Sequence, residues 1–116
     1  MAIAFEQTIA DAIAALERDL GLTSTELAGG LGVTTRTLDR WRKGESLPQR
    51  DARERLGALV SVRDHAYETL LADEVGRWIR SSLPVLAGLS PADLIRSGRA
   101  DRVDHVLGAI EHGIYL

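Results

Sequence analysis

The stretch STELAGGLGVTTRTLDRWRK, residues 24–43, decides how the first half of this chain folds. Its small residue Ala28 allows two helices to cross closely, and Gly32 can adopt the positive φ of a tight turn. The inner faces of both expected helices carry large apolar residues: Leu27, Leu31, Val33, Leu38 and Trp41. The pattern predicts a helix-turn-helix, and the alternative is an ordinary helical hairpin with a glycine turn.

The outer face of the second helix would carry the polar side chains that a recognition helix presents to DNA. The candidate DNA-binding residues are Thr34, Thr35, Arg36, Asp39, Arg40 and Lys43, together with Arg50 in the following helix. Arg50 would contact phosphates beside the recognition helix or stay solvated. Asp39 can accept a hydrogen bond from N4 of cytosine, or it can pair with Arg36 or Lys43 one turn away.

Basic charge is concentrated where such a helix would meet phosphates. The formal net charge of −3 argues at first against a nucleic-acid partner. Residues 34–63, however, hold eight basic and four acidic residues, whereas residues 1–33 hold one basic and five acidic residues. This distribution favours DNA binding. A solvated helix face with ion pairs between neighbouring turns is the alternative.

The composition describes a small globular protein. With 116 residues, 45% of them hydrophobic and 27% charged, the chain is long enough for one compact core or for two small helical units. It has no cysteine, which excludes disulfides and thiolate metal sites. No apolar run approaches the ~20 residues that span a membrane, and the N-terminus has no signal-peptide pattern. We expect a cytoplasmic protein.

Apolar residues at helical spacing predict further helices around the central stretch. The first covers residues 2–20, and the next begins at Thr23 or Ser24 and should be shortened or frayed by the Gly29-Gly30 pair. A long helix, roughly 35 Å at ~1.5 Å per residue, covers residues 49–71. We expect a short helix over residues 73–80 and an irregular connection over residues 81–89. Residues 90–93 start another short helix, which ends at Gly98, and the last helix covers residues 100–112.

No strand alternation appears, so the expected fold is all-α. We predict an N-terminal helix-turn-helix bundle (1–48), a long connecting helix (49–72) and a small C-terminal helical domain (73–116). Catalytic motifs are missing: there is no P-loop, no Gly-x-Ser-x-Gly and no Gly-x-Gly-x-x-Gly, and the three histidines lack metal-ligand spacing. The sequence therefore indicates no enzyme activity, no metal, no cofactor and no catalytic residue.

The second half resembles a known family. Its signature residues are Trp78, Pro84, Leu86, Gly88, Ser90-Pro91-Ala92-Asp93-Leu94, Gly98, Val103, Leu107, Ile110 and Gly113. In this order and spacing they resemble the toxin-binding C-terminal domain of bacterial antitoxins of the Xre/MbcA/ParS group, and the helix-turn-helix before them matches the same layout. Two places depart from the family pattern: Leu83-Pro84 where Asn-Pro is common, and Ala87-Gly88-Leu89 where a Gly-Gly-Arg run is common.

This resemblance implies a type II toxin–antitoxin system. The partners would be a cognate RES-domain toxin, which consumes NAD, and operator DNA, bound by a homodimer that represses its own operon. The antitoxin would not be catalytic. Carried over by position, the toxin-binding residues are Trp78, Pro91, Asp93, Leu94, Gly98, Arg102, Val103, Gly113, Ile114, Tyr115 and Leu116.

Several of these assignments have a structural alternative. Trp78, Leu94 and Val103 equally suit core packing. The apolar tail 114–116 either folds back on the domain or anchors the chain in another protein. Two other functions compete with the antitoxin: a stand-alone phage-type repressor whose C-terminal half only dimerises, and an interaction module that has lost DNA binding.

Overall fold

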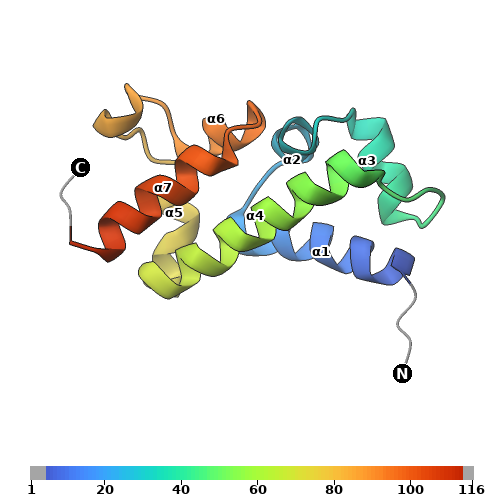
Figure 1. The fold of residues 1–116 in the computed structure, drawn as a ribbon, viewed down its shortest axis with the longest axis horizontal. Coiled ribbons are helices and arrows are strands. Elements are labelled where there is room, and N and C mark those ends of the chain that lie inside the picture. The colour runs from blue at the N-terminus through green and yellow to red at the C-terminus, as the bar shows by residue number, and fades with distance from the viewer. Residues whose placement is uncertain (1–4, 114–116) are drawn as a thin grey trace.

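The computed structural model describes residues 5–113, with side chains from Thr8 onward, and is helical with no strand in that range. The all-α prediction is confirmed (Figure 1). The α-helices are α1 (Phe5–Leu20), α2 (Ser24–Leu31), α3 (Thr35–Arg42), α4 (Arg50–Thr69), α5 (Val75–Ile79), α6 (Pro91–Arg96) and α7 (Ala100–Glu111). Two 3-10 turns, η1 (Ala72–Glu74) and η2 (Pro84–Leu86), lie before and after α5. No described helix is both long enough and apolar enough to cross a membrane.

Side chains cap the starts of three helices. Thr23 Oγ1 accepts a hydrogen bond from the Glu26 amide, and the Glu26 carboxylate accepts one from the Thr23 amide, which makes a capping box at α2. Ser90 and Asp93 form the same arrangement at α6, and Thr34 caps α3. Each cap satisfies amides that have no partner inside the first turn of the helix.

Two segments differ from the helix boundaries predicted from the sequence. The short helix expected over residues 73–80 is divided into η1 and α5. The segment 81–89, expected to be irregular, contains η2, a single 3-10 turn that begins at Pro84. Proline suits this place because it has no amide hydrogen, which would lack a partner in the first turn, and because its φ is already helical.

One continuous cluster of buried apolar residues joins the two halves of the chain. The cluster extends from Ile9 of α1 to Leu107 of α7. The central helix α4 contacts α1, α2 and α7, and Figure 1 shows it running between α1 and α7. All three segments of the predicted division, 1–48, 49–72 and 73–116, contribute to this core.

The glycine pair of α2 is a point of close backbone contact between the two halves of the chain. The sequence predicts that Gly29 and Gly30 shorten or fray the helix. The prediction of fraying is wrong, because α2 continues through both residues and ends at Leu31. A Cβ on Gly29 would overlap the carbonyl oxygen of Arg96, and one on Gly30 would lie 2.9 Å from the carbonyl oxygen of Ile95. The missing side chains therefore let the backbone of α2 lie directly against α6.

Ion pairs complement the apolar core. Arg63 joins α4 to α1 through Asp19, at 2.7 Å, and Arg80 joins the end of α5 to Glu26 of α2, at 2.6 Å. The hydrogen bond from Arg80 lowers the pKa of Glu26, with desolvation acting against it. Both carboxylates are largely shielded from water, which by itself favours their neutral forms. Hydrogen bonds from Arg18 and Arg63 lower the pKa of Asp19, as that from Arg80 does for Glu26, so both stay charged.

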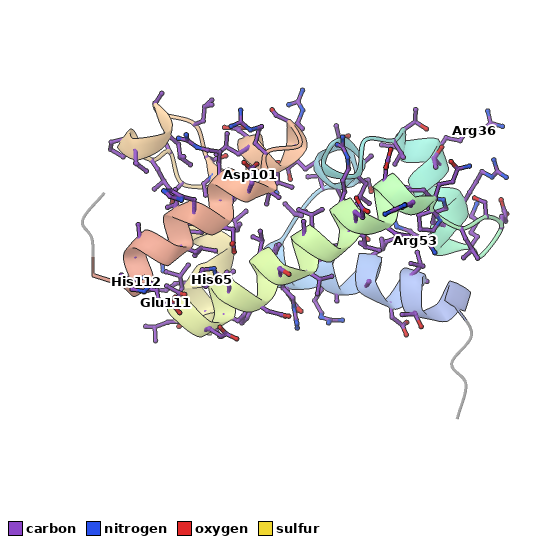
Figure 2. The ribbon with its side chains drawn as sticks, viewed as in Figure 1. Arg36, Arg53, His65, Asp101, Glu111 and His112 are labelled. Carbon is purple, nitrogen blue, oxygen red and sulfur yellow. The ribbon has the colours of Figure 1, made fainter. Side chains whose placement is uncertain are left out.

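A histidine connects α4 to the last helix. His65 Nδ1 lies 2.8 Å from a carboxylate oxygen of Asp104, and its Nε2, which is buried and makes no hydrogen bond, lies 3.4 Å from Glu111. Figure 2 shows His65 and Glu111 where α4 and α7 meet. The hydrogen bond to Asp104 raises the pKa of His65 above its ordinary value near 6.5, while partial burial opposes the rise.

The first prediction concerns Gly29→Ala. Alanine is the better helix former by about 1 kcal/mol. Its methyl group, however, would force α2 away from Arg96, and overpacking of this kind costs about 1–3 kcal/mol or more. We expect a net loss of stability in denaturant unfolding. Gly57→Ala in α4, where nothing lies within 4 Å of the added methyl, is the matched control and should stabilise the protein. If Gly29→Ala and Gly57→Ala changed the stability equally, the close contact between α2 and α6 would be contradicted.

The second prediction concerns pH. Because the pKa of His65 is higher in the folded than in the unfolded protein, its contribution is complete below about pH 6.5 and is lost as the pH rises through the folded value. We expect the free energy of unfolding of the wild type to fall as the pH rises from about 6.5 through the folded pKa of His65. Asp104→Asn, which removes the main cause of the shift, should flatten the pH dependence. If the free energy of unfolding of the variant falls with pH as steeply as that of the wild type, the His65–Asp104 pair does not contribute to stability.

Candidate functional site

Two candidate surfaces lie toward opposite ends of an elongated molecule. The described part measures 44 × 31 × 23 Å, with α3 toward one end of the long axis and η2 toward the other (Figure 1). The first surface is formed by α3 and the start of α4. The second surface is formed by η2, α6 and α7.

The segment predicted as a helix-turn-helix forms α2, a tight turn and α3. Gly32 takes the left-handed conformation, with φ of 73°, and its amide donates to the end of α2. Leu38 and Trp41 are buried on the inner face of α3. With this face in the core, the opposite face of α3 is free to meet a partner.

The predicted recognition residues lie mainly on the outside of the molecule. Thr34, Thr35, Arg36, Arg40 and Lys43 are exposed, and Figure 2 shows Arg36 projecting outward from α3. Within the described residues, Arg36 and Arg40 form no ion pair. Their charges are therefore available to an external anion.

Asp39 is half-buried and paired within α3. Its carboxylate lies 3.1 Å from Lys43 Nζ and 3.6 Å from Arg42. The hydrogen bond to Lys43 lowers the pKa of Asp39 and raises that of Lys43. Of the pairings considered from the sequence, the structure has the one with Lys43. This pair neutralises part of the charge of the outer face.

Arg42, which the sequence analysis did not single out, has a structural role. Its guanidinium binds Glu17 of α1 and donates to Ser24 Oγ of α2 at 2.9 Å. It thus connects α3 to both preceding helices. The structural role of Arg42 could have been predicted from the helical spacing of α3, because Arg42 adjoins buried Trp41 on the inner side of the helix.

The arginines of α4 differ in their surroundings. Arg50 is exposed and lies 3.3 Å from Glu54, one turn on. Arg55 lies beside two glycines whose backbone is in the left-handed conformation. A Cβ on Gly32 would lie 3.2 Å from Nη1 of Arg55, and one on Gly98 would lie 3.3 Å from it. Arg55 therefore lies at the C-terminal ends of α2 and α6, where helix dipoles favour a cation.

Several residues that the resemblance assigned to toxin binding shape α6. Pro91 is buried at its first position, exposed Asp93 completes the capping box, and Gly98 follows the helix with φ of 78°. Hydrogen bonds from the Ser90 backbone and side chain lower the pKa of Asp93. Val103 is fully buried in α7, so it packs the core.

Other assigned residues face solvent-accessible hollows. Leu94 and Arg102 line a hollow of about 210 Å³ together with Val85, Leu86, Ala87, Leu89 and Arg99. Half-buried Trp78 lines a separate hollow with Leu70. Gly113 is exposed at the end of α7, and the predictions for Ile114, Tyr115 and Leu116 lie outside the described residues. The structure therefore brings Leu94 and Arg102 together and leaves Trp78 apart from them.

Sequence reasoning missed Val85, Leu89 and Arg99. Val85 and Leu89 are exposed apolar residues in a segment that was interpreted as an irregular connection. The signal was present in the run Leu83-Pro84-Val85-Leu86, which is too apolar for a plain solvated loop. Within residues 5–113 no group of three or more His, Asp or Glu side chains is arranged so that it could hold a metal ion.

Comparison with known proteins finds similar sequences among bacterial antitoxins. Residues 65–113 match the family model of the antitoxin Xre/MbcA/ParS C-terminal toxin-binding domain. The mycobacterial cidal antitoxin MbcA, from Mycobacterium bovis and from Mycobacterium tuberculosis, is 35% identical over 102 residues, which cover 88% of this chain and 89% of the relative. A probable mycobacterial cidal antitoxin of Mycobacterium tuberculosis is 26% identical over 120 residues, across the full length of both chains.

A solved structure extends this similarity to the fold. The chain matches one in the crystal structure of the Mycobacterium tuberculosis MbcT–MbcA toxin–antitoxin complex with a TM-score of 0.69 and 32% identity. The match covers 92% of this chain and 96% of the other. With this identity over most of both chains, the protein belongs to the Xre/MbcA/ParS family of antitoxins.

Proposed function

We propose that this protein neutralises a cognate toxin through its C-terminal half and represses its own operon through the helix-turn-helix. The observation that carries the first part is the similarity to a chain of the MbcT–MbcA complex over 92% of the sequence. The resemblance noted from the sequence extends the proposal to a RES-domain toxin that consumes NAD. In this proposal the antitoxin binds the toxin and performs no chemistry.

The C-terminal surface has the properties that a protein partner requires. Exposed apolar residues and arginines surround the hollow at Leu94 and Arg102. Gly113, at the end of α7, leads into the apolar residues Ile114, Tyr115 and Leu116. We propose that these three residues enter the toxin near its active site. Tyrosine is frequent among residues that dominate binding energy.

The third prediction tests toxin binding. Co-expression of the full chain with the product of the neighbouring gene should yield a stable complex, whose mass gives its stoichiometry. Removal of residues 113–116 should weaken this complex by about 2 kcal/mol, roughly thirtyfold in affinity, and reduce neutralisation. The truncated chain should melt at the temperature of the full chain, since the deletion begins after α7.

Complex formation by the full chain and the effect of removing residues 113–116 test different parts of the proposal. Absence of any complex with the full chain would contradict the antitoxin function. A complex that forms and neutralises equally well without residues 113–116 would contradict only the role of the tail.

The DNA-binding part of the proposal rests on α3 and α4. Arg36 and Arg40 are exposed and without ion pairs among the described residues, on the face of α3 opposite to buried Leu38 and Trp41. Such motifs bind paired half-sites about one helical turn apart as dimers. We propose a homodimer on the operator, with Arg50 near the phosphates.

The fourth prediction tests this surface. Replacing both Arg36 and Arg40 by Ala should weaken operator binding by about 2 kcal/mol or more and reduce the slope of log affinity against log salt by about 2, because each arginine neutralises about one phosphate. Titration by fluorescence anisotropy at several salt concentrations measures both. Arg77 is an exposed arginine of α5. The control variant Arg77→Ala should change neither the operator affinity nor its salt dependence. Equal affinity and slope for the double variant would show that the outer face of α3 does not bind DNA.

A further inference from the structure

The segment of residues 83–89, which we name the η2 loop, is closed on itself by hydrogen bonds. The Leu83 amide donates to the carbonyl of Leu89 at 3.1 Å, and the Gly88 amide donates to the carbonyl of Leu83 at 3.0 Å. The Ser82 hydroxyl donates to the Gly88 carbonyl as well. The loop is therefore held in one shape before any partner binds, which reduces the entropy lost on association.

This shape includes an unfavourable backbone conformation. Ala87 has φ of 57°, and no other non-glycine residue within the described range has a positive φ. Alanine adopts this left-handed region less readily than glycine, because its Cβ approaches the following backbone. Residues held in such conformations cluster at sites that bind other molecules. The strain is thus a second sign of a binding loop, independent of its hydrogen bonds.

The ordered loop presents apolar side chains to solvent. Leu86 points into the protein and is 4% exposed, whereas Val85 is 39% and Leu89 is 47% exposed. Together with half-buried Leu94 they line the hollow of about 210 Å³. Grouped apolar residues around a hollow are typical of protein-binding surfaces rather than of solvated loops.

Two arginines of the α6–α7 region complete the hollow. Arg102 forms no ion pair within residues 5–113, and Arg99 has only a 3.7 Å contact with exposed Asp101. Figure 2 shows Asp101 at the start of α7, close to α6. The hollow therefore combines an apolar wall with uncompensated positive charge. Its complement is an apolar side chain with a carboxylate beside it.

The location of this hollow identifies its occupant. All of its lining residues fall within residues 65–113, the part that matches a toxin-binding domain. We propose that the η2 loop is a docking site for the toxin, in which an apolar toxin side chain enters between Val85, Leu89 and Leu94 and a toxin carboxylate binds Arg102. This inference rests on the proposed function and deepens it, because it adds a contact separate from the C-terminal tail.

The fifth prediction concerns the affinity of the complex between the full chain and the toxin of its own operon. The double variant Val85→Ser and Leu89→Ser should bind at least about tenfold more weakly, chiefly through faster dissociation. Arg102→Glu should weaken binding at least as much and slow association, whereas Arg102→Lys, which keeps the charge, should lose less. Surface plasmon resonance separates the two rates.

Matched controls test whether the effect is local. Leu47, in the connection between α3 and α4, is 42% exposed and so resembles Leu89 in exposure. Leu47→Ser should bind the toxin like the wild type. Because Val85 and Leu89 are exposed, their variants should keep the melting temperature of the wild type. Hydroxyl-radical footprinting of the unmodified proteins gives a measurement without mutation: oxidation of Val85 and Leu89 should fall when the complex forms.

The possible results distinguish this inference from the proposed function. If the wild-type chain forms no complex with the toxin, both are overturned. If the complex forms while the loop variants bind like the wild type and oxidation of the loop is unchanged, the docking site alone is overturned. If the loop variants convert a dimer of the free chain to a monomer without changing toxin affinity, the hollow joins two copies of this chain, which also overturns the inference.

Discussion

The close approach of α2 to α6 is the constraint on which the rest of the structure depends. At Gly29 and Gly30 the backbone of α2 lies against the carbonyls of Arg96 and Ile95, so no side chain separates the two helices. This contact places Leu59 of α4 within reach of the same helices and lets one apolar cluster continue from α1 to α7. Larger residues at the two positions would push α2 and α6 apart, because a helix pair cannot approach so closely with intervening Cβ atoms.

The shared core determines how the two candidate surfaces are related. The outer face of α3 and the η2 loop lie toward opposite ends of the molecule, while their inner sides belong to the same packed body (Figure 1). Arg55 reinforces this arrangement, since its guanidinium lies beside Gly32, at the turn before α3, and beside Gly98, after α6. A partner at one surface therefore leaves the other accessible, which suits a protein proposed to bind both DNA and a toxin.

The predicted site residues have two different kinds of role in the fold. Pro91, Asp93 and Gly98 start and end α6, and Val103 packs in the apolar core. Leu94 and Arg102 face the hollow, as do Val85 and Leu89, which are not among the signature residues. Residues of both kinds appear in one sequence signature, because a binding surface requires the helices that hold it in place as much as the side chains that contact a partner.

The sequence by itself determined the helices, their caps and the family, because these depend on local spacing. Apolar residues three and four apart predict helix faces, and Thr23, Thr34 and Ser90 mark helix starts through contacts with residues three positions on. Only the tertiary structure decided the role of the Gly29–Gly30 pair, the partners of Arg42 in α1 and α2, and the exposure of Val85 and Leu89. Each of these depends on residues distant in the sequence: a glycine that weakens an isolated helix becomes necessary when another helix packs against it, and local periodicity carries no information about that neighbour.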